Sequence, residues 1–169
     1  PLFQFVARRV RVRDTEHTFY VFPHPGAVAV IAVRDGHVAL IRQYRPAVER
    51  MMLEIPAGVL EPGEDPAQAA ARELEEETGL IAGKLERIGG LYATPGYSAE
   101  YLHVFLATDL TEGKTAFDPG EQIDELIWAT PAELTEAVRR GQLEDAKTIA
   151  ALFLLQTYAQ SADKTLFGG

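Results

Sequence analysis

Four glutamates crowd the C-terminal end of a short predicted helix, and they are the residues of this sequence best suited to chemistry: Glu73, Glu75, Glu76 and Glu77. A helix end of this kind already carries partial negative charge, and like charges four residues apart repel one another. The arrangement therefore costs stability unless a cation sits beside it. Carboxylate oxygens without cysteine or paired histidines suit a hard ion, Mg²⁺ or Mn²⁺, better than zinc.

Local signals set the limits of this helix. Asp65 suits the N-cap, Pro66 the first helical position and Gly79 the C′ position, so the helix is predicted over residues 66–78. One stripe of the helical wheel is small or apolar and is expected to pack on a sheet. Its members are Ala67, Ala70, Ala71, Leu74 and Thr78.

Three of the glutamates are expected to converge. Glu73, Glu76 and Glu77 share a second stripe about 100° wide, while the remaining glutamate points to the other side of the packing face. An ordinary solvated acidic face is the alternative, but the repulsion within the stripe disfavours it. Arg72 is expected to pair with Glu76 or with Glu64 of the preceding loop, which would position the cluster rather than neutralise it.

The spacing of these residues resembles the Nudix box, GX5EX7REUXEEXGU, in which U is apolar. Gly58, five residues, Glu64, seven residues and the run Arg-Glu-Leu-Glu-Glu-Glu-Thr-Gly-Leu at 72–80 match it at every fixed position. The match covers residues 58–80. The resemblance implies an α/β/α sandwich with mixed β-sheets that hydrolyses a nucleoside diphosphate linked to another moiety and requires Mg²⁺ or Mn²⁺.

Roles carried over from the family pattern follow the same positions. Glu73, Glu76 and Glu77 are the implied metal-ligating or water-orienting carboxylates, and Glu73 and Glu77 are the candidates among them for a catalytic role. The backbone carbonyl near Ala57 or Gly58 is implied to be a further metal ligand. Three residues are implied to support the loop and the helix rather than the chemistry: Gly58, Glu64 and Arg72.

A second segment resembles the ADP-ribose pyrophosphatase subfamily. Pro95 stands 16 residues beyond Gly79, within Ala-Thr-Pro-Gly-Tyr-Ser-Ala-Glu at 93–100. The alternative is an ordinary Pro-Gly turn between strands. In the subfamily a loop glutamate serves as general base or orients water, and Glu100 is the first candidate for that role, with Glu121 as its rival.

Two upstream segments also resemble ADP-ribose and nucleotide-sugar pyrophosphatases. Residues 41–46 (IRQYRP) contain Arg42 and Arg45, whose planar guanidinium groups suit phosphate. Both are candidate ligands of the diphosphate, the alternative being surface arginines at a strand end. Glu54, within residues 53–58 (LEIPAG), either anchors the Pro-Ala-Gly turn or contacts the substrate.

The predicted reaction is hydrolysis of ADP-ribose to AMP and ribose 5-phosphate. Pro95 and Tyr97 are assigned to the substrate site, and Tyr97 or Phe19 is a candidate to stack on the base, although single aromatics more often pack in a core or loop. Two alternatives stay open: a broader hydrolase that accepts FAD, a nucleotide sugar or a dinucleoside polyphosphate, and a non-catalytic nucleotide-binding sensor.

The remaining pattern indicates an α+β fold. Residues 3–22 alternate apolar and polar and are expected to form an antiparallel hairpin with one solvated face. Asp35-Gly36 predicts a type I′ turn in a second hairpin. Further strands are predicted at 85–92, 101–107 and 123–129, and two helices follow, one from Thr130-Pro131 to Gly141 and one at 145–159. Residues 1–24 are assigned to an N-terminal hairpin and residues 25–169 to the Nudix domain.

Composition limits the partners. The net charge of −9 argues against nucleic acid and anionic lipid. The apolar tract at 148–159 is too short to span a bilayer, and no charged-then-apolar leader opens the sequence, so we expect a cytoplasmic protein. The resemblance implies a homodimer in which the N-terminal hairpin is the candidate dimerisation arm. Leu166 and Phe167, near the C-terminus, are candidate docking residues.

Overall fold

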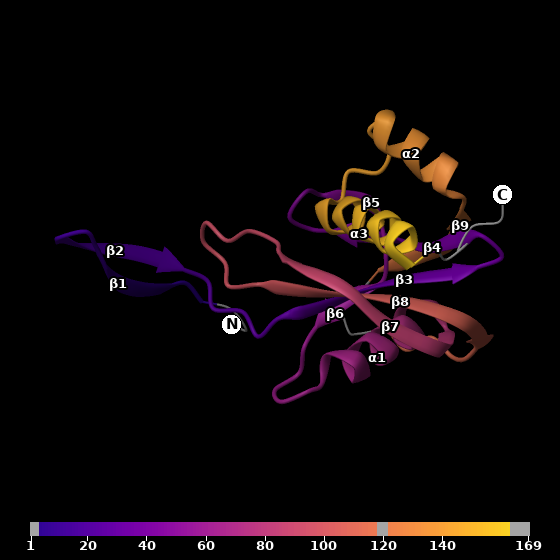
Figure 1. The fold of residues 1–169 in the computed structure, drawn as a ribbon, viewed down its shortest axis with the longest axis horizontal. Coiled ribbons are helices and arrows are strands. Elements are labelled where there is room, and N and C mark those ends of the chain that lie inside the picture. The colour runs from indigo at the N-terminus through magenta and orange to yellow at the C-terminus, as the bar shows by residue number, and fades with distance from the viewer. Residues whose placement is uncertain (1–3, 118–121, 163–169) are drawn as a thin grey trace.

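The computed structural model describes residues 4–117 and 122–162 (Figure 1). Glu121, Leu166 and Phe167 lie outside these residues. The strands are β1 (Val6–Val12), β2 (Thr15–Val21), β3 (Ala27–Arg34), β4 (His37–Arg45), β5 (Arg50–Glu54), β6 (Ala57–Val59), β7 (Leu80–Tyr92), β8 (Tyr101–Glu112) and β9 (Ile123–Ala129). The helices are α1 (Pro66–Thr78), α2 (Pro131–Arg139) and α3 (Ala146–Ala162).

The strands after the N-terminal hairpin form one mixed sheet. Its path is β5-β4-β3-β8-β7, with β6 paired to β3 and β9 paired to β4. The central pairing is parallel and joins β3 to β8, from Ala27 opposite Leu102 to Ala32 opposite Ala107. The other pairings of the sheet are antiparallel. The predicted mixed sheet is therefore confirmed.

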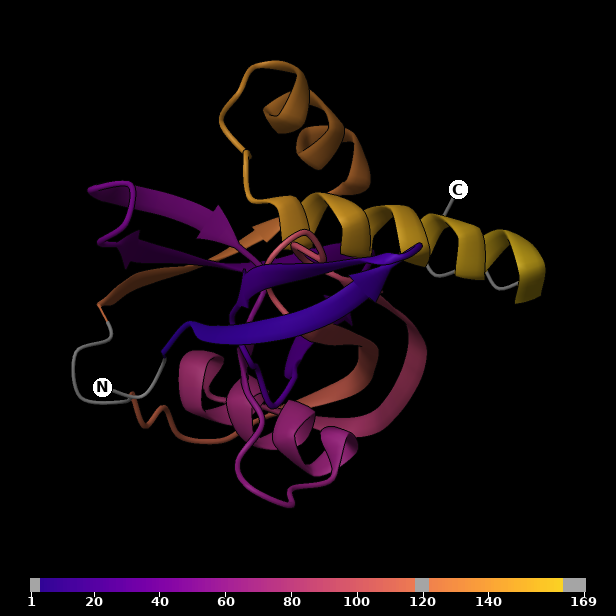
Figure 2. The same cartoon turned by 90° about the vertical axis from the view of Figure 1, so that its left-hand side faces the viewer.

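Helices cover both faces of this sheet. Figures 1 and 2 show α1 on one side and α2 and α3 on the other. Because successive residues of a strand point to opposite faces, β3 supplies both cores. Ala27, Ala29, Ile31 and Val33 join the core beneath α2 and α3, and Val28, Val30 and Ala32 join the core beneath α1. The predicted α+β class with α/β/α layering is confirmed.

Local sequence signals correctly placed several elements. Asp35 and Gly36 have φ values of 49° and 73° between the paired strands β3 and β4, as a type I′ turn requires. Helix α1 begins at Pro66, where the Asp65 carboxylate accepts hydrogen bonds from the amides of the first turn, and it ends at left-handed Gly79. Helix α2 begins after Thr130, as predicted, with a capping box formed by Thr130 and Glu133.

Two strands are longer than predicted. β7 and β8 pair with each other from Leu80 opposite Glu112 to Tyr92 opposite Tyr101. The predicted strands at 85–92 and 101–107 cover only part of this ladder. The additional pairs extend the ladder from Leu80 opposite Glu112 to Lys84 opposite Thr108, and they depend on the partner strand more than on local propensity.

The packing face of α1 is rotated from the predicted one. Ala67 and Ala71 are exposed, so the prediction that they pack on the sheet is wrong. The buried residues of the helix are Ala69, Ala70, Leu74, Glu77 and Thr78. Glu77, which was assigned to the acidic stripe, therefore lies on the buried face, and the cost of burying its carboxylate is offset by a hydrogen bond described below.

The N-terminal hairpin, β1 and β2, extends away from the rest of the molecule (Figure 1). Every residue of β1 is exposed, and β2 is exposed except at Val21. The expectation of a single solvated face is therefore wrong within one chain. The alternation itself is present, because one face of the hairpin carries the exposed Val6, Val10, Val12 and Phe19 together with the half-buried Val21.

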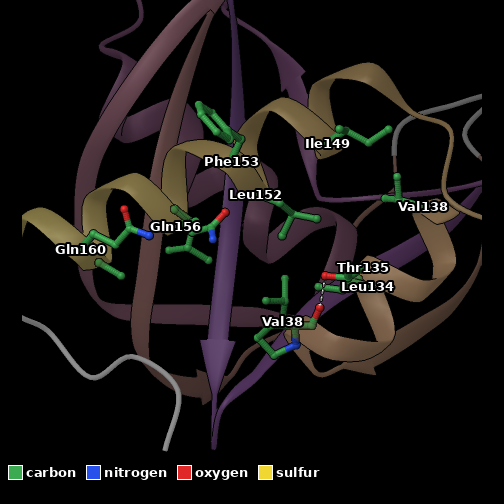
Figure 3. Close-up of a pocket in the computed structure, with 12 residues that line it drawn as sticks. Val38, Leu134, Thr135, Val138, Ile149, Leu152, Phe153, Gln156 and Gln160 are labelled. Carbon is green, nitrogen blue, oxygen red and sulfur yellow. Dashed lines mark hydrogen bonds between the residues drawn. The ribbon is translucent and has the colours of Figure 1, made fainter. Parts of the chain in front are cut away.

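An apolar groove of about 440 Å³ lies between α2 and α3 (Figure 3). Leu134 and Val138 line it from α2, and Ile149, Leu152 and Phe153 line it from α3. None of the residues predicted to form the functional site lines this groove. Within the described residues, no helix has both the length and the apolar character needed to cross a membrane.

Candidate functional site

The backbone at Gly58 lies directly against the Glu73 carboxylate. A Cβ atom added to Gly58 would lie 1.9 Å from Glu73 Oε1, which is far inside van der Waals contact. Gly58 belongs to β6, and Glu73 projects from α1 onto that short strand. Any other side chain at position 58 would displace the Glu73 carboxylate, which occupies the space in which that side chain would begin.

The Glu77 carboxylate is buried against Ala57, the residue before Gly58. Glu77 is only 2% exposed, and its Oε2 accepts a hydrogen bond of 2.9 Å from the Ala57 amide. Ala57 itself is held opposite Ala29 of β3. Two consecutive residues of β6 therefore contact two glutamates that lie one helical turn apart on α1.

Arg72 connects the remaining carboxylates. Its guanidinium makes two hydrogen bonds to Glu64, of 2.9 and 3.0 Å. Its Nη1 donates to Glu73 Oε1 at 2.8 Å and to Glu76 Oε2 at 2.9 Å. The two predicted partners of Arg72, Glu64 and Glu76, are both present, together with Glu73. The hydrogen bonds from Arg72 lower the pKa of the Glu64 carboxyl, and those to Glu64 raise the pKa of the arginine.

The donor chemistry of this cluster fits a hard divalent cation. Glu73 and Glu76 already converge on one positively charged nitrogen, and one arginine among four carboxylates leaves net negative charge. As they stand, the described residues contain no group of three or more carboxylates or imidazoles gathered to hold an ion. Arg72 Nη1 lies between the two glutamates where a cation is expected.

Arg45, which is partly exposed, and the buried Glu54 form an ion pair beside this cluster. Arg45 Nε and Nη2 donate to the two Glu54 oxygens at 2.9 and 2.7 Å, and Lys147 of α3 donates to the same carboxylate. Burial alone would raise the pKa of Glu54, but Arg45 and Lys147 outweigh it and the pKa lies below its usual value. With Glu54 only 1% exposed, the geometry favours anchoring over substrate contact.

The structure does not bring the two candidate phosphate-binding arginines together. Arg42 and Arg45 are three residues apart on β4, so their side chains leave opposite faces of the strand. Arg42 is exposed, whereas Arg45 is held by Glu54. The pKa of Arg45 is raised first by its hydrogen bond to Glu54, and the negative charge of Glu77 adds to the shift.

The loop between β7 and β8 carries the other predicted residues. Pro95 lies in a turn in which Thr94 O accepts hydrogen bonds from Tyr97 N and Ser98 N. Glu100 N donates to Ser98 Oγ at 3.2 Å. Tyr97 is 53% exposed. Glu100 therefore lies in the β7–β8 loop and not on α1. The same loop contains the turn that the Pro-Gly pair predicts.

This loop is bonded to the base of the N-terminal hairpin. Phe22 N donates to Tyr97 O at 2.6 Å, and Ala99 N donates to Phe22 O at 3.0 Å. The rings of Phe5 and Tyr97 lie 6.3 Å apart between centroids. Phe19, the other aromatic candidate for base stacking, lies instead on the apolar face of the hairpin.

Sequence reasoning missed three polar residues at the start of α3. Asp145, Lys147 and Thr148 all contact one another or the end of β5, and Thr148 is fully buried. One local signal was available, since Asp145 precedes the helix and its carboxylate accepts from Thr148 N, as an N-cap does. The contacts to β5 join residues more than 90 positions apart, which no local pattern reveals.

The chain belongs to the NUDIX domain family, whose model matches residues 23–152. Nudix hydrolases generally depend on divalent metal ions. The chain is 45% identical over 139 residues to an ADP-ribose pyrophosphatase of Bacillus subtilis (strain 168), covering 80% of this chain and 75% of that protein. It is 38% identical over 154 residues to an ADP-ribose pyrophosphatase of Mycobacterium tuberculosis (strain ATCC 25618 / H37Rv), covering 88% and 74%.

A solved structure confirms the fold. A crystal structure of an ADP compounds hydrolase superposes with a TM-score of 0.85 at 25% sequence identity, covering 95% of this chain and 88% of the other. The predicted membership of the family and the predicted resemblance to ADP-ribose pyrophosphatases are both confirmed.

Gly58→Ala is expected to damage the carboxylate cluster while the fold is kept. The added methyl group takes the place of the Glu73 carboxylate, which is the end of a flexible side chain and moves away. We expect affinity for Mn²⁺ to fall roughly 10-fold or more, as when groups that orient ligands are lost. Mn²⁺ titration followed by electron paramagnetic resonance measures it. Gly96→Ala is the control, because nothing lies within 4 Å of a Cβ there. Equal affinity in all three proteins would contradict the prediction.

Glu54→Gln is expected to lose stability at neutral pH but not in acid. The folded-state pKa of Glu54 is below its usual 4.5, so its stabilisation is complete above that pH and is lost as the pH falls through the folded-state value. At pH 7 we expect a loss of about 3 kcal/mol, because Arg45 loses its carboxylate partner and Lys147 keeps only Asp145.

Urea unfolding at a series of pH values tests this. The difference between wild type and Glu54→Gln should shrink below about pH 4.5. Glu112→Gln is the matched control, since Glu112 pairs with Arg34 at an exposed site, and its effect should stay within about 0.5 kcal/mol at every pH. A difference that did not change with pH would show that the charge of Glu54 is not its source.

Proposed function

We propose that this NUDIX protein is a pyrophosphatase that hydrolyses the diphosphate of ADP-ribose to AMP and ribose 5-phosphate. One observation carries the proposal: the carboxylates of Glu73 and Glu77 lie against the backbone of Ala57 and Gly58, with Glu76 beside them on Arg72. This concentrates negative charge around a backbone segment able to share a cation. The names of the two relatives support ADP-ribose as the substrate.

The proposed cofactor is Mg²⁺ or Mn²⁺, held by Glu73, Glu76, Glu77 and the carbonyl of Ala57. A diphosphate resists hydrolysis largely because its negative charge repels nucleophiles. A bound divalent cation supplies charge screening and lowers the pKa of a coordinated water. The chain contributes hard oxygen donors for such an ion, and a segment of β6 that is fixed relative to α1 on both sides of the carbonyl.

The remaining residues of the site are proposed to orient and bind. Arg72, tied to Glu64, keeps Glu73 and Glu76 facing the same point before a cation arrives. Glu100 is the proposed residue that orients or deprotonates the attacking water, with Glu121 as its rival. The exposed Arg42 is proposed to contact the diphosphate, and Tyr97, two residues after Pro95, to stack on the base.

Arg45 and Glu54 enter this proposal in altered roles. The bidentate pair between them uses two of the nitrogens that Arg45 would present to a phosphate. Its remaining N–H donors and its positive charge act near Glu77. We therefore propose that Glu54 orients Arg45, and that Arg45 contributes positive charge beside the diphosphate.

A product assay tests the function. ADP-ribose, FAD and GDP-mannose are incubated separately with Mg²⁺ or with EDTA in H₂¹⁸O, and the products are identified by mass spectrometry. We expect AMP only when metal is present, and we expect it to form fastest from ADP-ribose. The product that carries ¹⁸O identifies the attacked phosphorus. Glu77→Gln is expected to lower turnover on the order of 100-fold, whereas Glu75→Gln, whose carboxylate faces Gly113, should retain it.

The outcomes separate the alternatives. Faster turnover of FAD or GDP-mannose would contradict ADP-ribose as the preferred substrate and would favour a hydrolase of broader or different specificity. Full activity of Glu77→Gln at limiting metal would remove Glu77 from the proposed ligands. Thermal stabilisation by ADP-ribose without any product would favour the nucleotide-binding sensor. The cytoplasmic location stays a prediction.

We also propose that the protein is a homodimer in which the N-terminal hairpin lies on a partner chain. On the apolar face of the hairpin, Val6, Val10, Val12 and Phe19 are exposed within one chain, which is typical of an interface. Residues 4–22 contain four arginines and two acidic residues, whereas the whole chain has a net charge of −9. A second copy of this chain therefore offers an acidic surface to a basic arm.

Val10→Glu is expected to convert the dimer into a monomer, because it buries a charge in the apolar face. Thr18→Glu is the matched control, since Thr18 pairs with Arg9 on the opposite face of the hairpin. Size-exclusion chromatography with light scattering measures both masses. A wild-type protein that is monomeric, or a Val10→Glu variant that stays dimeric, would overturn the proposed interface.

A further inference from the structure

Three polar residues at the start of α3, one buried and two partly buried, have no role in the proposed chemistry. Thr148 is fully buried, and the side chains of Lys147 and Asp145 are 18% and 16% exposed. Helix α3 lies on the face of the sheet opposite α1 and its glutamates (Figures 1 and 2). Polar groups buried at such a place are costly unless they are fully hydrogen-bonded, so their contacts indicate what they hold.

The Thr148 hydroxyl is fixed in one orientation by its two partners. Its oxygen accepts a hydrogen bond of 3.0 Å from Ile55 N, and its hydrogen is donated to Asp145 Oδ2 at 2.6 Å. Asp145 Oδ2 also accepts from Thr148 N at 2.9 Å. The carboxylate therefore directs the hydroxyl proton toward itself and leaves the lone pair facing Ile55.

A second link holds the preceding residue. Lys147 donates to the Glu54 carboxylate and lies 3.1 Å from Asp145 Oδ2. The first turn of α3 thus contacts Glu54, the last residue of β5, and Ile55, which follows it. Both belong to the segment that continues directly into the proposed metal ligand, Ala57.

Every residue from 54 to 58 is held by a different contact. After the two residues held by α3, Pro56 O accepts from Val30 N at 2.9 Å. Ala57 N donates to Glu77, and Gly58 lies against Glu73. A displacement at Ile55 is two residues from Ala57, and the intervening Pro56 has a restricted φ that transmits it rather than absorbing it.

We propose that Thr148, oriented by Asp145, is a positioning residue that sets the Ala57 backbone relative to Glu77, so that divalent-cation affinity at α1 depends on a hydroxyl from the opposite side of the sheet. The proposal rests on the proposed function, because the cation site is part of it. Removal of the hydroxyl leaves the buried Ile55 N–H and one Asp145 interaction unsatisfied, and the strand end moves to relieve them.

The test compares three substitutions in the chain of residues 1–169. Thr148→Val removes the hydroxyl at nearly constant volume, and Thr148→Ser restores it without the methyl group. Thr157→Val is the matched control on the same helix, because the Thr157 hydroxyl donates to Phe153 O at an exposed position. Mn²⁺ is the probe, titrated without substrate by electron paramagnetic resonance, at a temperature well below each melting temperature.

We expect Thr148→Val to bind Mn²⁺ about 10-fold more weakly than wild type, the effect typical of losing an outer group that orients a ligand. Thr148→Ser and Thr157→Val should bind like wild type. The Ala57 amide resonance in ¹H–¹⁵N spectra of the metal-free protein should shift in Thr148→Val and not in Thr157→Val, which reports the positioning without any metal.

The contrary outcomes are distinct. A lowered melting temperature with unchanged Mn²⁺ affinity and an unchanged Ala57 resonance would show that Thr148 only stabilises α3. Failure of wild type to bind Mn²⁺ would overturn this proposal and the proposed metal site together. If Thr148→Val does not fold, Asp145→Asn replaces it, because it leaves an acceptor oxygen but weakens the orientation of the hydroxyl, and the same two readouts decide.

Discussion

Repulsion among the carboxylates at the end of α1 is the constraint on which the other contacts of the site depend. The helix dipole and the spacing of Glu73, Glu76 and Glu77 both disfavour this cluster. Positively charged or hydrogen-bond-donating groups offset this repulsion from three elements: the guanidinium of Arg72, the amide of Ala57 and the nearby charge of Arg45. Each of these groups needs an anchor of its own, which Glu64, β3 and Glu54 supply. The repulsion among the glutamates of α1 is therefore offset by residues of several different elements.

Much of the fold followed from signals that act within a few residues. The bounds of α1 were predicted correctly because Asp65, Pro66 and Gly79 each perform a local task that no distant contact is needed to explain. The turn at Asp35-Gly36 was predicted for the same reason, since positive φ at both positions is a property of the backbone itself. The Nudix spacing also placed Gly58 beside α1, and the structure gives the reason in the space taken by Glu73.

What the sequence did not reveal depends on distant partners. Ala67 and Ala71 have the composition of a packing face, but the hydrogen bond from Ala57 draws Glu77 toward the sheet and turns them outward. Lys147 and Thr148 look like ordinary residues of a helix start, and only the fold brings them to Glu54 and Ile55. The hairpin was predicted from its alternation, whereas the absence of a cover for its apolar face is visible only in three dimensions.

The parallel pairing of β3 with β8 has a consequence for the growing chain on the ribosome. Residues 27–32 find their partners 75 positions later, at 102–107. Until β8 has been synthesised, β3 has an open edge and seven residues destined for burial, which is the kind of strand that associates with other chains. Closing so long a loop also slows folding. The interval between synthesis of β3 and β8 is therefore when this protein is most exposed to aggregation, and when a chaperone would protect it most.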